Sequence, residues 1–460
     1  MRWTGARVAV AGVCALLVGA AGVGTGAYLA GRDPSGSLAA PTGTPSATPA
    51  ALTAPGPVLP EPSSGPALSP AGVARALAGP LGDVRLGGRV SATVLDAGTG
   101  EVLLDRGGST PVIPASTAKL ATSAAVLSVT DPDQRLTTRV VAGAEPGEVV
   151  LVGGGDVTLS AAPVGRPSAY AGAARVATLG TDARRAGAAA VTRVVVDSSL
   201  FTGPALAPGW DPVDIDGGYI APIVATMVDA GRQDGVRARS AAPDLAAGRA
   251  LAAALGAPAA SVVRGTAPPA ARTLAEVHSQ PIPRLVEQML LESDNVLAEA
   301  LARQVALVEG WPASFAGAAS ATSAVLARLG VPPVSRLVDG SGLSLQDRVT
   351  PALLAALLWA AAQPDHPNLH ALVPGLPVSG YLGTLDDRFR TGAAAPAAGQ
   401  VRAKTGTLIG VSALAGLVRG ADGRLLVFAV VADRVPAGGT LAAEEALDVL
   451  AATLAGCGCR

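Results

Sequence analysis

Two lysines stand apart in this chain of 460 residues because nearly all of its other basic side chains are arginines. Lys119 and Lys404 are the only lysines among 34 lysine and arginine residues. Arginine stays protonated, whereas a lysine amine that is buried or lies beside another cation can lose its proton and act as a base. Either lysine is therefore a candidate for amine chemistry. A codon bias that missed two positions would also explain them, so the neighbouring residues have to decide.

The first lysine follows a serine by three positions, in the stretch Pro-Ala-Ser-Thr-Ala-Lys-Leu. If a helix begins at or near Ser116, the side chains of Ser116 and Lys119 share one face, with Cβ atoms about 5–6 Å apart. A neutral lysine at that distance can take the hydroxyl proton and make the serine a nucleophile. Free N–H groups at the helix start can stabilise the oxyanion that then forms on a carbonyl. The alternative is that Ser116 is only an N-cap.

The second lysine opens the stretch Lys404-Thr405-Gly406-Thr407, which we expect on a β-strand. A glycine within a strand lets another chain or a ligand come close to the backbone. The alternative is an edge-strand lysine beside a flexible position.

The triplet Ser293-Asp294-Asn295 lies within helical sequence and holds one of only two asparagines in the chain. Serine and asparagine inside a helix compete with the backbone for hydrogen bonds, so the triplet predicts a break between two helices that exposes both side chains. The alternative is that the triplet simply caps a new helix.

The order S-x-x-K, S-D-N and K-T-G is the set of motifs found in penicillin-binding proteins and serine β-lactamases. The chain resembles the penicillin-interacting serine enzymes, and more closely the D-alanyl-D-alanine carboxypeptidase/endopeptidase family, because a large insertion separates Ser116 from Ser293. The resemblance covers roughly residues 75–455 and includes the stretches 151–160, 197–210, 339–351 and 376–389. One departure, Leu-Ser-Val-Thr-Asp after the first helix, predicts a changed turn and the same chemistry.

The resemblance implies a role for each motif residue. Ser116 is the acyl-accepting nucleophile and Lys119 its general base, Ser293 relays a proton towards the leaving group, and Asn295 holds the substrate amide. Lys404 adds positive potential that helps to keep Lys119 neutral. The substrate-binding strand comprises Thr405, Gly406 and Thr407; Thr405 meets the substrate carboxylate, and the N–H groups of Ser116 and Thr407 form the oxyanion hole.

The same resemblance implies the substrate: the D-Ala-D-Ala end of peptidoglycan stem peptides, hydrolysed through an acyl-enzyme, with β-lactams as covalent inhibitors. We expect no cofactor and no metal. A serine β-lactamase remains an alternative, but it needs a deacylating group, for which Glu299 is the nearest residue in sequence. A catalytically silent wall-binding or antibiotic-sensing module is another alternative, although such a module has no need of Ser116, Lys119 and Lys404 together.

The elements around these motifs predict an α+β fold of the penicillin-binding and serine β-lactamase type. Extended runs at 89–97 and 101–107 form one antiparallel hairpin, and a second hairpin turns at 420–423. A final helix covers about Leu441 to Leu454. We therefore expect an antiparallel sheet built from both ends of the chain, flanked by helices, with an inserted mainly-β domain. The predicted domains are a signal or anchor at 1–32, a Pro/Ser/Thr/Ala linker at 33–70, a catalytic domain at 71–133 and 266–460, and the insertion at 134–265.

The N-terminal region predicts export. Arg2 and Arg7 precede an uncharged apolar stretch from Val8 to Ala30, long enough for a membrane anchor. A cleaved signal peptide with its cleavage site near Thr25 to Ala27 stays open. Either outcome places the enzyme at the extracytoplasmic face of the membrane or in the cell wall space, with the membrane as a partner only if the segment is uncleaved.

Other features of the sequence argue against rival functions. A formal net charge of −1 and an aromatic content of 3% provide no basis for nucleic-acid binding. The three histidines lie near no G-x-S-x-G elbow, which indicates structural or surface roles. Glycines 153–155 precede an aspartate and predict a tight turn, and residues 339–342 predict a turn with a packing role. Cys457 and Cys459 are interpreted as tail residues, awkwardly spaced for a disulfide.

Overall fold

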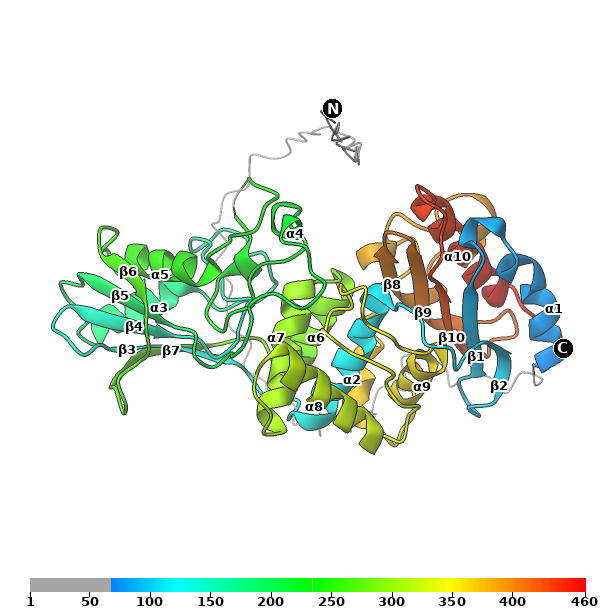
Figure 1. Ribbon diagram of the computed structural model, residues 1–460, viewed down its shortest axis with the longest axis horizontal. Helices are drawn as coiled ribbons and strands as arrows, with labels where there is room; N and C mark the ends of the chain where they lie inside the picture. Colours follow the sequence, from blue (N-terminus) through cyan, green and yellow to red (C-terminus); the bar gives the residue numbers. More distant parts are fainter. Residues whose placement is uncertain (1–67, 234) are drawn as a thin grey trace, which may run out of the picture. The chain divides into compact units, whose positions relative to one another are not determined.

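A computed structural model describes residues 68–233 and 235–460 (Figure 1). The predicted signal or anchor at 1–32 and nearly all of the predicted linker at 33–70 lie outside the described residues. None of the described helices combines the length and apolar character needed to cross a membrane. The first described helix, α1, begins at Pro70, where the sequence predicts that folded structure starts.

The first sheet is five-stranded, fully antiparallel and ordered β2-β1-β10-β9-β8. Strand β1 pairs with β10, so the two ends of the described chain meet inside this sheet. Both predicted hairpins are confirmed, as β1–β2 and β9–β10. The strands are β1 (Val90–Asp96), β2 (Val102–Arg106), β8 (Val401–Leu408), β9 (Val411–Arg419) and β10 (Leu425–Ala432).

Helices bury both faces of this sheet (Figure 1). Along β10, Leu426 and Phe428 pack with helices α1 (Pro70–Leu81) and α10 (Thr440–Ala455), whereas Val427 belongs to the core on the opposite face. This alternation follows from the two-residue period of a strand. The predicted C-terminal helix is confirmed as α10.

A helical region covers the second face of the first sheet. Its helices are α2 (Lys119–Val129), α6 (Ile282–Leu291), α7 (Asn295–Val308), α8 (Phe315–Arg328) and α9 (Pro351–Ala361). Helix α2 is buried almost all round, as its apolar sequence predicts. Short 3₁₀ helices occupy Val84–Leu86, Ala115–Ala118, Asp229–Gly231, Pro367–Leu372, Gly383–Leu385 and Gly392–Ala397.

The second sheet lies in the segment between α2 and α6, here called the inserted segment (residues 134–279). It is five-stranded in the order β6-β5-β4-β3-β7, with parallel pairs among β4, β5 and β6 and antiparallel pairs around β3. Its strands are β3 (Thr137–Ala142), β4 (Glu148–Val152), β5 (Arg193–Asp197), β6 (Ser261–Arg264) and β7 (Thr273–His278). Strand β7 extends the sheet beyond residue 265, the predicted end of the insertion.

Two helices pack on one face of the inserted sheet, so the insertion contains more helix than its mainly-β prediction implied. Helix α3 (Val176–Arg185) contributes Leu179 and α5 (Pro243–Ala254) contributes Leu251 to a core with Leu151 of β4. The parallel strands explain these helices, because parallel neighbours need crossover connections. A short helix, α4 (Val213–Asp216), lies in a longer connection.

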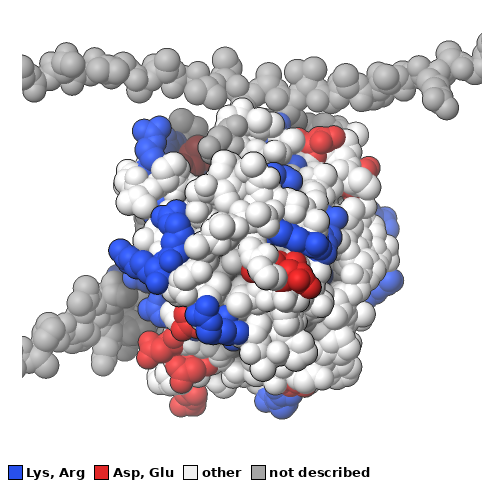
Figure 2. Space-filling view, turned by 90° about the vertical axis from the view of Figure 1, so that its left-hand side faces the viewer, with Lys and Arg blue, Asp and Glu red and all other residues white. Residues whose placement is uncertain are grey.

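Figure 2 shows that arginine and acidic side chains are interspersed on the face it draws, among mostly uncharged residues.

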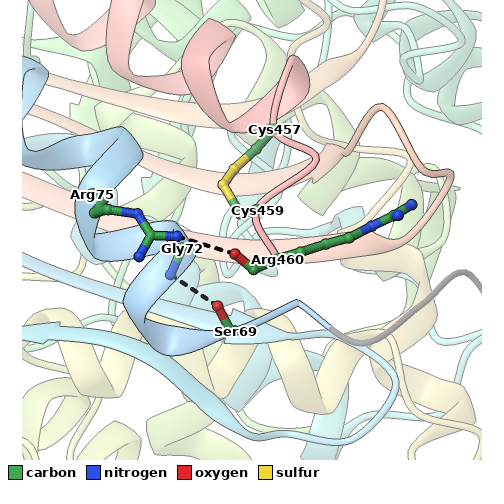
Figure 3. The surroundings of a disulfide bond; sticks show 6 residues. All are labelled: Ser69, Gly72, Arg75, Cys457, Cys459 and Arg460. Carbon is green, nitrogen blue, oxygen red and sulfur yellow. Dashed lines mark hydrogen bonds between the residues drawn. A yellow bond between two sulfur atoms is a disulfide. The ribbon is translucent and has the colours of Figure 1, made fainter.

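The two C-terminal cysteines form a disulfide that the sequence interpretation missed (Figure 3). The Cα atoms of Cys457 and Cys459 are 5.0 Å apart, within the range that a disulfide spans. The chain bends between them, since two residues of extended strand would cover about 6.6 Å. Both cysteines are buried in the core under α1 and α10, and the N–H group of Ser69 donates to the carbonyl of Cys459 at 2.8 Å. The interpretation of Cys457 and Cys459 as tail residues is therefore wrong, because both are buried and paired with each other.

Candidate active site

The S-x-x-K motif forms a 3₁₀ turn that continues directly into α2. Ser116 lies within the turn Ala115–Ala118, and Lys119 is the first residue of the α-helix. No side chain caps either start, so the alternative that Ser116 serves only as an N-cap is wrong. Instead its Oγ lies 2.9 Å from the Nζ atom of Lys119. Ser116 is partly exposed, whereas Lys119 is fully buried.

The amine of Lys119 has three neighbours at hydrogen-bonding distance. Besides Ser116, its Nζ atom lies 2.7 Å from Oδ1 of Asn295 and 2.8 Å from the carbonyl oxygen of Ser341. These two oxygens are acceptors only. A neutral amine satisfies both with its two N–H bonds, which leaves its lone pair for the hydroxyl hydrogen of Ser116. The surroundings therefore suit a neutral lysine that acts as a base.

Burial is the main reason why this lysine can be neutral. It lowers the pKa of Lys119 to about 8, because the charged amine loses its water. Three carboxylates, of Asp339, Asp294 and Glu299, act in the opposite direction and raise that pKa. Their pull opposes the effect of burial on the pKa. A group whose pKa lies near the working pH is well suited to general-base catalysis.

The S-D-N triplet is both a break and a cap, so both sequence interpretations hold. Helix α6 ends at Leu291, and Asp294 caps α7 by accepting a hydrogen bond from the N–H group of Leu297 at 3.0 Å. Ser293 has a φ of 54°, in the left-handed region. Such a conformation costs a non-glycine residue about 1–3 kcal/mol and persists only where the surroundings enforce it.

Side chains and backbone of the inserted segment contact the turn at residues 293–295, which the sequence did not predict. Oδ2 of Asp294 accepts hydrogen bonds from the hydroxyl of Tyr170 at 2.7 Å and from Arg232 at 2.6 Å. The side-chain amide of Asn295 donates to the backbone carbonyl of Tyr219 at 3.1 Å. Loops of the inserted segment therefore hold two members of the triplet.

The loop that follows Asp339 forms another wall of the site. Oδ1 of Asp339 accepts from the N–H groups of Ser341 and Gly342, at 3.1 and 2.6 Å. Its Oδ2 accepts from the indole N–H of Trp210, in the inserted segment, at 2.7 Å. Ser341 is fully buried and presents its carbonyl to Lys119. This confirms the predicted turn with a packing role. The loop also supplies a hydrogen-bond acceptor for the amine of Lys119, the carbonyl of Ser341, which the motifs did not indicate.

Glu299 supports the same loop through its carboxylate. It accepts hydrogen bonds from the N–H groups of Gly340 and Ser341, at 3.0 and 2.9 Å, and forms an ion pair with Arg303 at 3.6 Å. Burial is the largest cause that raises the pKa of Glu299, to about 7. Because its carboxylate is engaged by the loop backbone, it is poorly placed to deacylate an ester on Ser116.

The K-T-G motif lies on β8, at the edge of the first sheet, and packs against the S-x-x-K turn. A Cβ atom on Gly406 would approach the carbonyl oxygen of Pro114 to 2.8 Å. The glycine is therefore needed for a close backbone approach, as predicted, and it brings β8 against the turn that carries Ser116. Thr405 shares a hydrogen bond with Thr384, between hydroxyls 2.8 Å apart. Thr407 is exposed and donates to Glu444 at 2.6 Å.

Lys404 is buried, despite its place on an edge strand. Its Nζ atom donates to the carbonyl of Thr405 at 2.9 Å. Burial lowers the pKa of Lys404 well below its ordinary value, and repulsion from Lys119 and Arg388 lowers it further. Burial thus depresses the pKa of both amines. Because repulsion between two cations acts on both, the expected effect of Lys404 on Lys119 stays a prediction.

Two of the three histidines form hydrogen bonds away from this site. His278 contacts Thr137, and His370 contacts the carbonyl of Gln363. Within residues 68–233 and 235–460, no cluster of three or more histidine, cysteine, aspartate or glutamate side chains could hold a metal ion. In the predicted tight turn at residues 153–155, a Cβ atom on Gly154 would lie 2.1 Å from the carbonyl oxygen of Thr137.

Comparison with known proteins decides the family. The model of the D-Ala-D-Ala carboxypeptidase 3 (S13) family matches residues 73–235 and 232–454. This chain belongs to that family. It is 44% identical to the carboxypeptidase DacB of Mycolicibacterium smegmatis over 471 aligned residues, which cover 100% of this chain and 99% of the relative. It is 30% identical to a D-alanyl-D-alanine carboxypeptidase of an Actinomadura species, over 82% of this chain and 84% of the relative.

A solved structure has the same fold. Penicillin-binding protein 4 of Haemophilus influenzae superposes with a TM-score of 0.66 at 20% sequence identity, covering 82% of this chain and 97% of that chain. Its fold and the family match confirm the predicted penicillin-binding α+β fold. The chain is a serine-type D-Ala-D-Ala carboxypeptidase of the S13 family, as its three motifs predict.

Proposed function

We propose that this enzyme removes the terminal D-alanine of peptidoglycan stem peptides through an ester on Ser116, with Lys119 as the general base. The observation that carries the proposal is the position of the buried Nζ atom of Lys119. It lies 2.9 Å from the hydroxyl oxygen of Ser116, while two oxygen acceptors take its N–H bonds. No second base lies at hydrogen-bonding distance from that hydroxyl among the described residues.

In the acylation step, the lone pair of Lys119 takes the hydroxyl proton as Oγ of Ser116 bonds to the carbonyl carbon of the penultimate D-alanine. The N–H groups of Ser116 and Thr407 stabilise the oxyanion. The tetrahedral intermediate then collapses, the peptide bond breaks, and the proton reaches the leaving amine by way of Ser293. Free D-alanine departs and the peptide stays attached to Ser116 as an ester.

In the deacylation step, water gives a proton to Lys119 while its oxygen attacks the ester carbonyl. The ester bond breaks, Ser116 recovers its proton, and the shortened peptide leaves with a new carboxylate. Asn295 holds the substrate amide, and Thr405, beside the amine of Lys404, receives the substrate carboxylate. Gly406 keeps this strand close enough to the turn for one substrate to reach both.

We also propose that β-lactams acylate Ser116 and that the enzyme works outside the cytoplasmic membrane, where stem peptides are found. The Haemophilus penicillin-binding protein 4 has been solved in complex with a β-lactam. The predicted signal or anchor at 1–32 supports the location.

A fluorescent penicillin tests the mechanism. The purified protein should be labelled covalently and Ser116→Ala should not be, whereas Ser261→Ala, an exposed serine on β6, should be labelled as the unmodified protein is. Labelling of Ser116→Ala would refute the assignment of the nucleophile.

A pentapeptide that ends in D-Ala-D-Ala tests the reaction. Steady release of D-alanine is expected, with none from Ser116→Ala. Covalent labelling without any release would instead favour a sensor. Rapid turnover of penicillin would favour a β-lactamase, against which the engaged carboxylate of Glu299 argues. A cross-linked dimer of the same peptide, assayed in parallel, separates endopeptidase from carboxypeptidase activity.

A further inference from the structure

Asp294 is the point at which the inserted segment reaches the active site. Its side chain is fully buried, and the three strongest contacts to its carboxylate come from the hydroxyl of Tyr170, from Arg232 and from the N–H group of Leu297. After Tyr170 and Arg232, Arg239 is a third side chain of the inserted segment near this carboxylate. Its Nη2 atom lies 3.7 Å from Oδ2 of Asp294. A buried carboxylate with this many partners has one allowed position.

The partners of Asp294 are themselves held together. Arg232 donates to the hydroxyl of Tyr170 and lies over the tyrosine ring, with its guanidinium carbon 5.0 Å from the ring centroid. One planar guanidinium thus bonds both the carboxylate and the hydroxyl, which an ammonium could not do in the same geometry. Arg239 donates to the carbonyls of Gly218 and Ala230, each at 2.8 Å, and so fixes the chain beside Tyr219.

These contacts converge on the amine through Asn295. The residue next to Asp294 accepts from Lys119 with Oδ1 at 2.7 Å and donates with its amide to the carbonyl of Tyr219 at 3.1 Å. One side chain is therefore fixed between the inserted segment and the base. The preceding residue, Ser293, has a left-handed backbone, which persists only with support from its surroundings, and the anchored Asp294 is its neighbour in the chain.

We propose that Tyr170 and Arg232 are positioning residues: by anchoring Asp294, they hold Asn295 and, through it, the amine of Lys119 in the geometry that activates Ser116. The inference rests on the proposed function, since it concerns the same base. It assigns the inserted segment a role in the reaction although none of the proposed catalytic residues belongs to that segment.

The charge of Arg232 also bears on the proton affinity of the base. Asp294 is among the carboxylates that raise the pKa of Lys119, and Arg232 balances its charge. Loss of the guanidinium leaves Asp294 less balanced and should raise that pKa. The charged groups that act on Lys119 are Asp294, Glu299, Asp339 and Lys404. Each has neighbours of its own: Arg303 pairs with Glu299, Asp347 lies beside Asp339, Arg388 acts on Lys404, and Tyr170, Arg232 and Arg239 surround Asp294.

The test measures acylation by fluorescent penicillin as a function of pH and penicillin concentration. Arg232→Met should lower the maximal acylation rate about tenfold with little change in the half-saturating concentration, and should move the inflection of the pH profile up by on the order of one unit. Arg232→Lys restores the charge without the bonding geometry. It should return the inflection to its original pH while the rate stays reduced.

A matched control is Arg264→Met, which removes another arginine–aspartate pair of the inserted segment, with Asp244, whose hydrogen bonds do not reach the triplet. It should acylate at the original rate and with the original pH profile. An equal loss in Arg264→Met and Arg232→Met would overturn the inference, because it would indicate general loosening of the inserted segment.

If Arg232→Met does not fold, as judged by circular dichroism, Tyr170→Phe decides the question. This change removes one hydroxyl and keeps the ring under the guanidinium, and it should lower the acylation rate about fivefold. An original rate in Tyr170→Phe, or an original rate and pH profile in a folded Arg232→Met, overturns the inference. Labelling of Ser116→Ala in the same series would refute the proposed function instead, so the two failures are distinguishable.

Discussion

The two sheets of this enzyme have the same number of strands and different relations to the chemistry. The antiparallel sheet is assembled from both ends of the described chain and has the K-T-G residues on its edge strand, β8. The mixed sheet lies between α2 and α6, and none of the predicted site residues belongs to the inserted segment. Its loops nevertheless contact Asp294, Asn295 and Asp339.

The two sheets differ in what they supply: the first is associated with the proposed reacting groups, and the second with side chains that hold those groups in place. Lys119, at the start of α2, and Lys404, on β8 of the first sheet, are fully buried. Loss of water lowers the pKa of both amines. The inserted segment supplies hydrogen-bond donors to the buried carboxylates near Lys119. The indole of Trp210 donates to Asp339, and the guanidinium of Arg232 donates to Asp294. Buried carboxylates without such donors would be costly. The following predictions are ordered by their expected effect on acylation.

The largest effect is expected for Lys119→Arg. A guanidinium stays protonated and cannot act as the base, so the acylation rate should fall by about 10²–10⁴-fold. The measurement is the rate of covalent labelling by fluorescent penicillin. Arg402→Lys, an exposed basic residue on β8, is the control and should leave the rate unchanged. A loss of less than tenfold in Lys119→Arg would mean that another group takes the proton.

The pH dependence should follow the neutral fraction of the same amine. With the pKa of Lys119 near 8, that fraction rises with pH. The acylation rate should therefore increase about tenfold per pH unit well below pH 8 and level off above it. Stopped-flow labelling between pH 5.5 and about 9.5 measures this curve. A rate that falls as pH rises through 8 would contradict a neutral base.

A smaller effect is expected for Trp210→Phe, at the second contact between the inserted segment and the site. The variant keeps an aromatic ring against Phe315 but leaves Oδ2 of Asp339 without its indole donor. A hydrogen bond to a charged group contributes about 1.5–3 kcal/mol to stability. Thermal unfolding should show that loss, and the acylation rate should fall several-fold because the carbonyl of Ser341 is less well held. If neither the stability nor the acylation rate changes, Trp210 does not help to hold Asp339 and the carbonyl of Ser341 in place.

The smallest effect on acylation is expected for Leu151→Ala, in the core of the inserted sheet. The variant should lose about 2–5 kcal/mol of stability, because the deletion leaves a cavity. At a temperature where it remains folded, its acylation rate should stay within about threefold of the original, since Leu151 contacts no residue of the site. A tenfold loss would show that the sheet itself, and not only its loops, sets the geometry of the base.

Much of the fold could be predicted from local patterns. The two hairpins follow from turn residues between extended runs, and the break at Ser293 follows from residues that compete with a helical backbone. Strand β7, by contrast, joins the inserted sheet by pairing with β3, far away in the sequence. The pairing of Cys457 with Cys459 was also missed, because it depends on a bend that the spacing does not reveal.

The sequence by itself determined which groups could react: an amine three residues after a hydroxyl, a triplet that breaks a helix, and a second amine before a glycine. Short-range spacing is sufficient for this, since the helical repeat places Ser116 and Lys119 on one face. Only the tertiary structure decided what surrounds the amine. The carbonyl of Ser341 has no signature, because every residue has a carbonyl, and the burial that lowers the pKa of Lys119 comes from packing between segments far apart in the chain.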